Sequence, residues 1–238
     1  MSIKIGKTRY GQLLYPDKDT SIGKALTHYG ECHYEKIEFL KSHINPGDVV
    51  IDVGADIGLI TIPLAQKLGD SGYIVAFEQQ LLLYYTLCGN IALNNLNNAH
   101  AFLRIVSDEN GVIKSVPPID ISQEGNYTKF ESKEAVSLGY AVSTVNIDSL
   151  NLRSPALIKI KGDTYNAILG GKETIKRTKP FIYLETEERP LMLKLLEELG
   201  YTWETHKYPM FHSDNFYGST EDVFNYDIIN LFCWPESK

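Results

Sequence analysis

The chain has 238 residues, 43% of them hydrophobic, which is enough to bury one substantial core. It has 23 basic and 30 acidic residues, which give a formal charge of −7, and it contains no long run of basic residues. We therefore expect no nucleic-acid partner. Three widely spaced cysteines, no apolar signal segment and no apolar stretch of about 18 residues predict a cytoplasmic protein without a membrane partner.

Apolar residues recur at helical spacing in some segments and form β-branched runs in others, and the two kinds of segment alternate. The predicted helices cover 34–44, 57–68, 81–93, 165–176 and 189–199, and the predicted strands cover 49–53, 73–77, 100–106, 156–160, 180–184, 201–208 and 228–234. This alternation is typical of an α/β, Rossmann-like fold with helices on both faces of a mostly parallel, seven-stranded sheet. The last two strands, joined by a long loop, predict an antiparallel C-terminal edge.

Three appendages extend this framework, and we expect residues 1–238 to form one domain. Residues 1–33 alternate turn-formers with short apolar groups and are interpreted as an arm or lid. Residues 107–141 are too long for an ordinary connection, so we expect irregular structure near the site or at a subunit contact. Residues 201–238 hold the terminal strand pair and a substrate-side loop. Such appendages make a homo-oligomer an open alternative.

The most informative motif is Asp52-Val53-Gly54-Ala55-Asp56-Ile57-Gly58, which ends the first buried strand and opens the following helix. Ligands of open α/β sheets bind at this edge. A dinucleotide fingerprint has glycine at the position of Asp56, where a carboxylate repels a pyrophosphate but tolerates an ammonium and a sulfonium. The motif therefore favours S-adenosylmethionine over NAD, and an NAD-dependent oxidoreductase is the weakest interpretation.

Glu78 closes the second predicted strand, 20 residues after Gly58. A carboxylate at this place can accept hydrogen bonds from both ribose hydroxyls. The alternative is a plain connecting turn with a solvated acid at the end of the strand. The candidate cofactor-binding residues are Asp52, Gly54, Ala55, Asp56, Ile57, Gly58, Glu78 and Gln79.

The segment from Pro46 to Gly58, with Ala76-Phe77-Glu78, closely resembles FkbM-type methyltransferases. Further segments that resemble the family are 8–11, 90–97, 107–111, 147–150, 157–160, 209–218 and 230–235. The resemblance implies the class I methyltransferase form of the Rossmann-like fold. It also implies S-adenosylmethionine-dependent O-methylation of a small-molecule acceptor, typically a hydroxyl of a sugar or secondary metabolite.

One position departs from the family pattern. The family usually carries Lys-Ile-Asp-Val-Glu-Gly after the fourth strand, whereas this chain has Lys159-Ile160-Lys161-Gly162-Asp163-Thr164. Lys161 thus replaces an aspartate, and it opposes a cofactor ammonium unless it pairs with Asp163 or Asp52. A degenerate protein that binds cofactor or a partner without turnover is therefore the second hypothesis.

Removal of a proton from a hydroxyl acceptor requires a base. His206 and His212 in the C-terminal segment, Glu185 at the end of the fifth strand, and Asp163 at the family's glutamate position are the candidate catalytic residues. For each histidine the alternative is an ordinary surface or hydrogen-bonded residue. Other histidines, His33 among them, show no ligand spacing, and we expect no metal.

Overall fold

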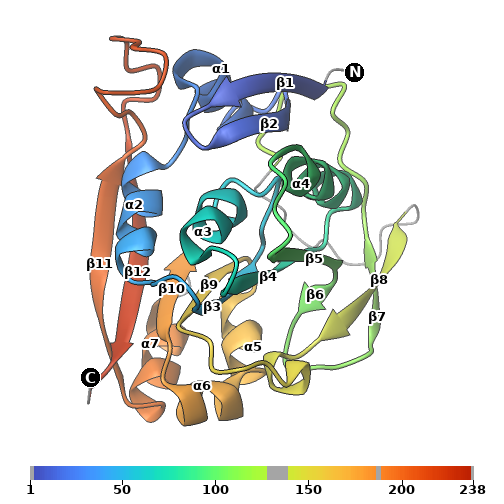
Figure 1. Ribbon diagram of the computed structural model, residues 1–238. Coiled ribbons are helices and arrows are strands. Elements are labelled where there is room, and N and C mark those ends of the chain that lie inside the picture. Colours follow the sequence, from blue (N-terminus) through green and yellow to red (C-terminus); the bar gives the residue numbers. More distant parts are fainter. Residues whose placement is uncertain (1–2, 128–138, 186–188, 237–238) are drawn as a thin grey trace.

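A seven-stranded sheet forms the centre of the computed structural model, which describes residues 3–127, 139–185 and 189–236 (Figure 1). Its strands, in spatial order, are β11 (Tyr201–Pro209), β12 (Asp227–Pro235), β10 (Phe181–Glu185), β9 (Leu157–Lys161), β3 (Val49–Val53), β4 (Tyr73–Glu78) and β5 (Ala99–Leu103). The strands from β10 to β5 are parallel, and β12 is antiparallel to both neighbours. The predicted sheet with its antiparallel C-terminal edge is thereby confirmed.

Helices cover both faces of this sheet, as predicted. They are α1 (Ile22–Tyr29), α2 (Tyr34–Ser42), α3 (Thr61–Leu68), α4 (Leu81–Leu93), α5 (Thr164–Leu169), α6 (Lys172–Thr178) and α7 (Arg189–Glu198). Two apolar clusters fill the layers, one under α1 to α3 and one under α5 to α7. Residues of β3 alternate between the clusters, with Val50 in the first and Ile51 and Val53 in the second.

Two predicted elements are divided in the structure. The helix expected over 165–176 is broken at Gly170 and Gly171, where a Cβ on Gly170 would lie 2.1 Å from the carbonyl oxygen of Ser107. The strand expected over 100–106 becomes β5 and β6 (Ile105–Val106), and β6 leaves the main sheet to pair with β8 (Tyr140–Val145). Both breaks arise from tertiary contacts that helical or strand periodicity does not encode.

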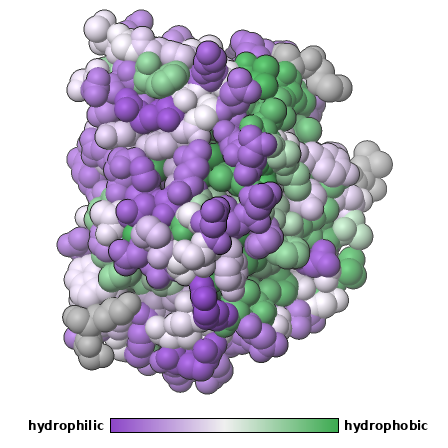
Figure 2. Space-filling view, viewed as in Figure 1, coloured by the Kyte–Doolittle hydropathy of each residue, from purple (hydrophilic) through white to green (hydrophobic). Residues whose placement is uncertain are grey.

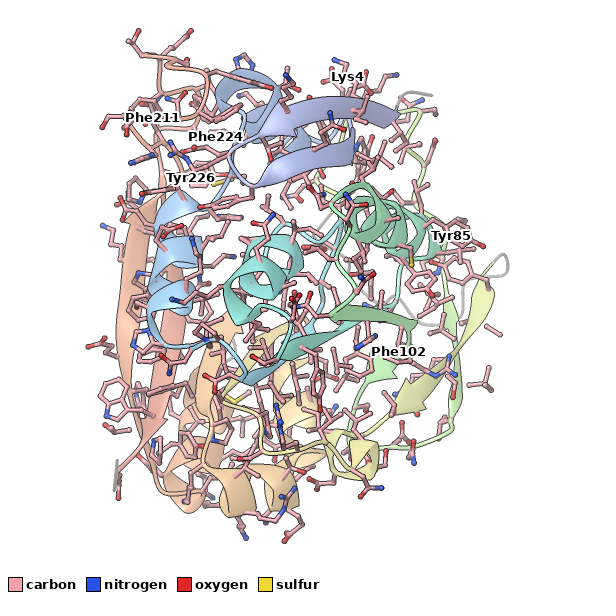
Figure 3. The ribbon with its side chains drawn as sticks, viewed as in Figure 1. Lys4, Tyr85, Phe102, Phe211, Phe224 and Tyr226 are labelled. Atoms are coloured by element: carbon pink, nitrogen blue, oxygen red, sulfur yellow. The ribbon has the colours of Figure 1, made fainter. Side chains whose placement is uncertain are left out.

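The first 33 residues are more regular than an arm of turns. They contain a hairpin of β1 (Ile3–Thr8) and β2 (Gly11–Pro16), followed by α1. Figure 1 shows this unit at the top of the molecule, above α3 and α4. The segment between β11 and β12 contacts it, because Phe211 and Phe224 pack against Tyr29 at ring distances of 5.5 and 6.0 Å (Figure 3).

The segment predicted as a long irregular loop contains strand β7 (Ile113–Val116), which pairs with β8 in a small separate sheet with β6. Residues 128–138 of this segment lie outside the described residues. A 3₁₀ helix, η1 (Ile147–Leu150), then leads to β9. Within the described ranges, no helix has the length and apolarity needed to cross a membrane.

Candidate functional site

The turn from β3 to α3 passes very close to the neighbouring strand β9. A Cβ on Gly54 (φ +70°) would lie 2.8 Å from the carbonyl oxygen of Lys161, so only glycine fits there. A Cβ on Gly58 (φ +90°) would lie 2.7 Å from a methyl group of Leu87 on α4. The two glycines therefore bring the turn against β9 and let α3 pack beside α4.

Glu78, the last residue of β4, holds this turn with its carboxylate. It accepts hydrogen bonds from the backbone N–H groups of Asp56 (2.8 Å) and Gln80 (2.7 Å). Burial, reinforced by the nearby Asp56 carboxylate, raises the pKa of Glu78 to about 7. Each carboxylate oxygen can accept more than one hydrogen bond, so Glu78 keeps acceptor capacity for hydroxyl groups of a ligand.

Asp52 lies below the turn and is fully buried. Its Oδ2 accepts a hydrogen bond from the Thr61 hydroxyl at 2.7 Å, and its Oδ1 lies 3.2 Å from the ammonium of Lys159. The same ammonium donates to the carbonyl oxygen of Gly54 at 2.8 Å. Asp52 and Lys159 thus support the turn from within the sheet.

The other candidate cofactor residues lie around the turn. Ala55 and Ile57 are buried in the apolar clusters next to it. Gln79 follows Glu78, and its carbonyl oxygen accepts a hydrogen bond from the hydroxyl of Tyr140 at 3.3 Å. The strand β8, which carries Tyr140, therefore contacts the chain just beyond the glycine turn.

Lys161 pairs with Asp56 rather than with either acid considered from the sequence. Its Nζ lies 2.6 Å from Oδ2 of Asp56, which sits in the turn at a positive φ of 50°. Asp163 instead caps α5, where it accepts hydrogen bonds from the backbone and the side-chain amide of Asn166 at 3.2 and 2.8 Å. The replacement of the family's aspartate by lysine is therefore compensated within the turn itself.

Glu185, at the end of β10, lies among lysines. Its Oε1 is 2.8 Å from the ammonium of Lys36 and 3.6 Å from that of Lys159. Burial opposes its charge, but the two lysines outweigh burial and hold the pKa of Glu185 well below its usual range. Glu185 is consequently an anion that two lysines hold in place.

A small cavity of about 20 Å³ opens among these charged groups, enough for roughly one water molecule. Its lining residues are Ile22, His33, Lys36, Ala55, Asp56, Leu59, Ile60, Lys159, Lys161 and Glu185. The cavity thus joins the glycine turn, the ends of β9 and β10, and the start of α2.

His33 is a lining residue that sequence reasoning missed. It precedes α2 in a left-handed conformation (φ 57°), and its Nδ1 lies 3.2 Å from the Tyr208 hydroxyl. Burial, followed by the charge of Lys36, holds the pKa of His33 well below its ordinary value, so the imidazole is neutral. No spacing in the sequence links His33 to the turn, because the packing of α2 on the sheet brings them together.

The two histidines proposed from the sequence lie elsewhere. His206 stacks on Phe39 at 4.1 Å, and its Nδ1 is 2.8 Å from the Tyr183 hydroxyl. His212 stacks on Tyr34 at 3.9 Å, and its Nδ1 is 3.0 Å from a carboxylate oxygen of Glu31. Of the four candidate catalytic residues, only Glu185 lines the small cavity.

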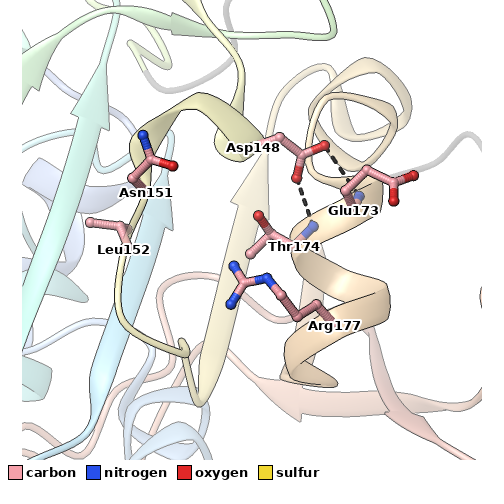
Figure 4. A pocket seen from close by; sticks show the side chains of 6 residues that line it. All are labelled: Asp148, Asn151, Leu152, Glu173, Thr174 and Arg177. Atoms are coloured by element: carbon pink, nitrogen blue, oxygen red, sulfur yellow. Dashed lines mark hydrogen bonds between the residues drawn. The ribbon is translucent and has the colours of Figure 1, made fainter.

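A larger and shallower hollow of about 330 Å³ lies between η1 and α6 (Figure 4). Asp148, one of its two acidic lining residues, already accepts hydrogen bonds from the backbone N–H groups of Glu173 (3.1 Å) and Thr174 (2.7 Å) at the start of α6. Among the described residues no cluster of acidic, histidine or cysteine side chains has the arrangement of a metal site. The chemistry-bearing groups therefore gather at the glycine turn.

Comparisons with known proteins agree with this architecture. The family described as Methyltransferase FkbM domain matches residues 52–203. Over 54 residues, 23% of this chain and 21% of the relative, the chain is 46% identical to the tRNA(Phe) (4-demethylwyosine(37)-C(7)) aminocarboxypropyltransferase of Methanocaldococcus jannaschii. The chain thus spans about a fifth of that curated relative.

Solved structures share the fold at low sequence identity. An FkbM methyltransferase from Methylobacillus flagellatus aligns with a TM-score of 0.52 and 14% identity over 79% of this chain and 44% of its own length. A SAM-dependent O-methyltransferase from Thermotoga maritima aligns with a TM-score of 0.54 and 14% identity over 98% and 77%. M. jannaschii TYW2, solved in complex with AdoMet, aligns with a TM-score of 0.53 and 16% identity over 98% and 84%.

Proposed function

The chain belongs to the FkbM family of methyltransferases, and on this premise we propose that it transfers a methyl group from S-adenosylmethionine to a hydroxyl of a small polar acceptor. The observation that carries the proposal is Glu78 at the glycine turn, a buried carboxylate beside a turn that only glycine permits. These residues fit the adenosyl half of the cofactor, whose ribose offers two hydroxyl donors. When bound, the cofactor supplies an electrophilic methyl group on its sulfonium.

The acceptor hydroxyl must lose a proton as the methyl group is transferred. Two lining residues are candidates for receiving it, Glu185 and His33. Lys36 and Lys159 already engage the carboxylate of Glu185 in ion pairs, whereas the neutral imidazole of His33 has a nitrogen without a proton. We therefore favour His33 as the base and assign Glu185 to the positioning of Lys36 and Lys159.

A small acceptor agrees better with the charge of the chain than an RNA does. The net charge is −7, and the lysines at the cavity are already paired with carboxylates. RNA binding rests on unpaired basic groups that neutralise phosphates. A sugar or secondary metabolite requires no such surface. The three cysteines are free, and two of them are buried, which supports a reducing compartment such as the cytoplasm.

The experiment that tests this function is a transfer assay with labelled S-adenosylmethionine and a panel of sugars, hydroxylated metabolites and tRNA. Label in a sugar or metabolite supports the proposal. Label in tRNA alone would replace the proposed acceptor class. Glu78→Gln, which weakens the ribose site, serves as the control and should transfer less label at cofactor concentrations below saturation.

A second candidate function is cofactor or partner binding without turnover. It is supported by the Lys161–Asp56 ion pair, which places a lysine at the position of the family's aspartate and engages both charges at the turn. In that case Lys161→Asp, which restores the family's residue, should strengthen cofactor binding or restore transfer. Lower affinity after this substitution would mean that Lys161 has a role of its own.

A further inference from the structure

The Lys161–Asp56 pair joins the ends of two adjacent strands at the glycine turn. Lys161 is the last residue of β9, and its Cβ lies 3.1 Å from the place where a Cβ on Gly54 would be. Asp56 presents its carboxylate from the turn itself, 2.6 Å from the ammonium. The two side chains are 22% and 14% exposed, so a ligand that enters the turn meets both charges.

The neighbouring pair, Lys159 and Asp52, has a different character. The two side chains are 2% and 0% exposed, and the ammonium of Lys159 also donates to the carbonyl oxygen of Gly54. This pair is a fixed part of the turn. Among the ion pairs of the described residues at this turn, Lys161–Asp56 is therefore the one that can exchange partners with a ligand.

Each lysine around the cavity has a carboxylate partner: Lys36 and Lys159 contact Glu185, Lys159 also contacts Asp52, and Lys161 contacts Asp56. A ligand with a lone ammonium that takes the carboxylate of Asp56 leaves Lys161 without a partner, and a ligand with a lone carboxylate that takes Lys161 leaves Asp56 without one. A zwitterion supplies a partner to both side chains.

We propose that Lys161 and Asp56 bind the α-amino-acid tail of the cofactor by exchange of ion-pair partners. The tail carboxylate takes the ammonium of Lys161, and the tail ammonium takes the carboxylate of Asp56. This inference rests on the proposed function, since it presupposes that the adenosyl group binds at Glu78. It gives Lys161 a binding role that the family's aspartate cannot have, and it makes the site selective for zwitterionic tails.

The exchange preserves charge pairing at every atom. One Lys–Asp contact is replaced by two contacts with the tail, so neither side chain is left without a partner in a partly buried site. A charge-assisted hydrogen bond in such a place contributes about tenfold or more in affinity. The alternative is that the Lys161–Asp56 pair is a latch that only blocks the turn. Removal of Lys161 would then free space and increase the affinity for S-adenosylhomocysteine, the opposite of what we propose.

The test is calorimetric titration of the full chain with three ligands that differ only in the tail. S-adenosylhomocysteine has both tail charges, S-adenosyl-3-thiopropylamine lacks the carboxylate, and 5′-methylthioadenosine lacks both. The wild-type chain should bind S-adenosylhomocysteine about tenfold or more tighter than the amine. In Lys161→Met the carboxylate of Asp56 is free, so the preference should reverse in favour of the amine.

Two further variants keep this test decisive. Lys161→Arg retains the cation and should retain the preference for S-adenosylhomocysteine. Lys207→Met removes a lysine from an exposed pair with Asp227, 2.8 Å apart at the far edge of the sheet, and should change neither affinity. The double variant Asp56→Asn/Lys161→Met removes the pair without leaving a lone charge, so it should bind S-adenosylhomocysteine and the amine with equal affinity. Thermal unfolding of each variant checks that it is folded.

Equal binding of S-adenosylhomocysteine and the amine by the wild-type chain would overturn the inference and leave the proposed function intact. Tighter binding of S-adenosylhomocysteine by Lys161→Met would overturn it as well, because the pair would then be a latch. Failure of all three ligands to bind the folded wild-type chain would overturn both this inference and the proposed function.

Discussion

Among single residues, Glu78 and Asp56 form one hydrogen-bonded unit at the glycine turn. The backbone N–H of Asp56 donates to Glu78, while the side chain of Asp56 neutralises Lys161. The same contacts place a carboxyl group with a pKa of about 7 where ribose hydroxyls are expected. Cofactor binding is therefore expected to depend on pH within the neutral range.

We predict that affinity for S-adenosylhomocysteine falls as the pH drops from about 8 to about 6, because Glu78 becomes protonated as pH falls through about 7. Hydroxyl donors favour the carboxylate, so binding lowers the pKa of Glu78 and releases protons near neutral pH. Calorimetry in buffers of different ionisation enthalpy measures this release. Glu78→Gln should abolish it, and the same proton release in that variant would assign the effect to another group.

We also predict that His33→Ala lowers kcat about 100-fold or more, as expected for the loss of a general base, with little change in the cofactor KM. The matched variants are His206→Ala and His212→Ala, whose rings lie away from the cavity. Initial rates with an acceptor found in the transfer assay provide the measurement. A larger loss in either of the matched variants would move the base to the C-terminal segment.

Among the structural elements, α4, strand β2 and the glycine turn are connected by the hydrogen bonds of one buried side chain, Asn90. Asn90 on α4 accepts a hydrogen bond from the backbone N–H of Leu14 (2.6 Å) and donates to the carbonyl oxygens of Leu14 (3.0 Å) and Ile57 (2.7 Å). The N-terminal hairpin, α4 and the glycine turn are thus joined at one residue. This explains how an appendage far away in the sequence supports the glycine turn.

Asn90→Ala is expected to lower the free energy of unfolding by about 2 to 4 kcal/mol, because it leaves buried backbone groups without partners. The control is Asn94→Ala, which removes similar bonds to Gln12 at a more exposed place and should cost about 1 kcal/mol or less. Urea unfolding measures both. Equal losses of unfolding free energy in the two variants would show that burial of the side-chain amide does not determine how much it stabilises the fold.

The sequence predicted the central elements well because their signals are local. Val49 to Val53 is a β-branched run that ends at glycine, and the structure has β3 over the same residues. The helix over 81–93 also matches α4 in both bounds. The hairpin of β1 and β2 was missed because its stability comes from contacts such as Asn90, which lie far away in the sequence.

The candidate site was less predictable than the fold. Periodicity and motif spacing located the glycine turn and Glu78, because these residues lie at strand ends. The partner of Lys161 depends on which side chain of the turn faces β9, and the sequence analysis named Asp163 and Asp52 but not Asp56, the partner in the structure. The place of His33 depends on how α2 packs, which no local pattern records.

At the scale of the whole molecule, the surface carries an apolar band. Figure 2 shows it in the right half of the view, over α4 and β5. Residues 81–93 of α4 include no charged side chain, and Tyr85 and Phe102 are 61% and 46% exposed (Figure 3). Self-association stays a prediction of the sequence, and sedimentation of the purified chain at several concentrations tests it.

Calorimetric titration of the purified chain with S-adenosylmethionine is the sharpest test of whether the glycine turn and Glu78 bind this cofactor. We predict micromolar affinity for the wild-type chain, on the order of −8 kcal/mol, and an affinity at least about tenfold lower for folded Glu78→Gln. Unchanged affinity in Glu78→Gln would contradict the ribose site. No binding by the folded wild-type chain would contradict both the cofactor site and the proposed methyl transfer.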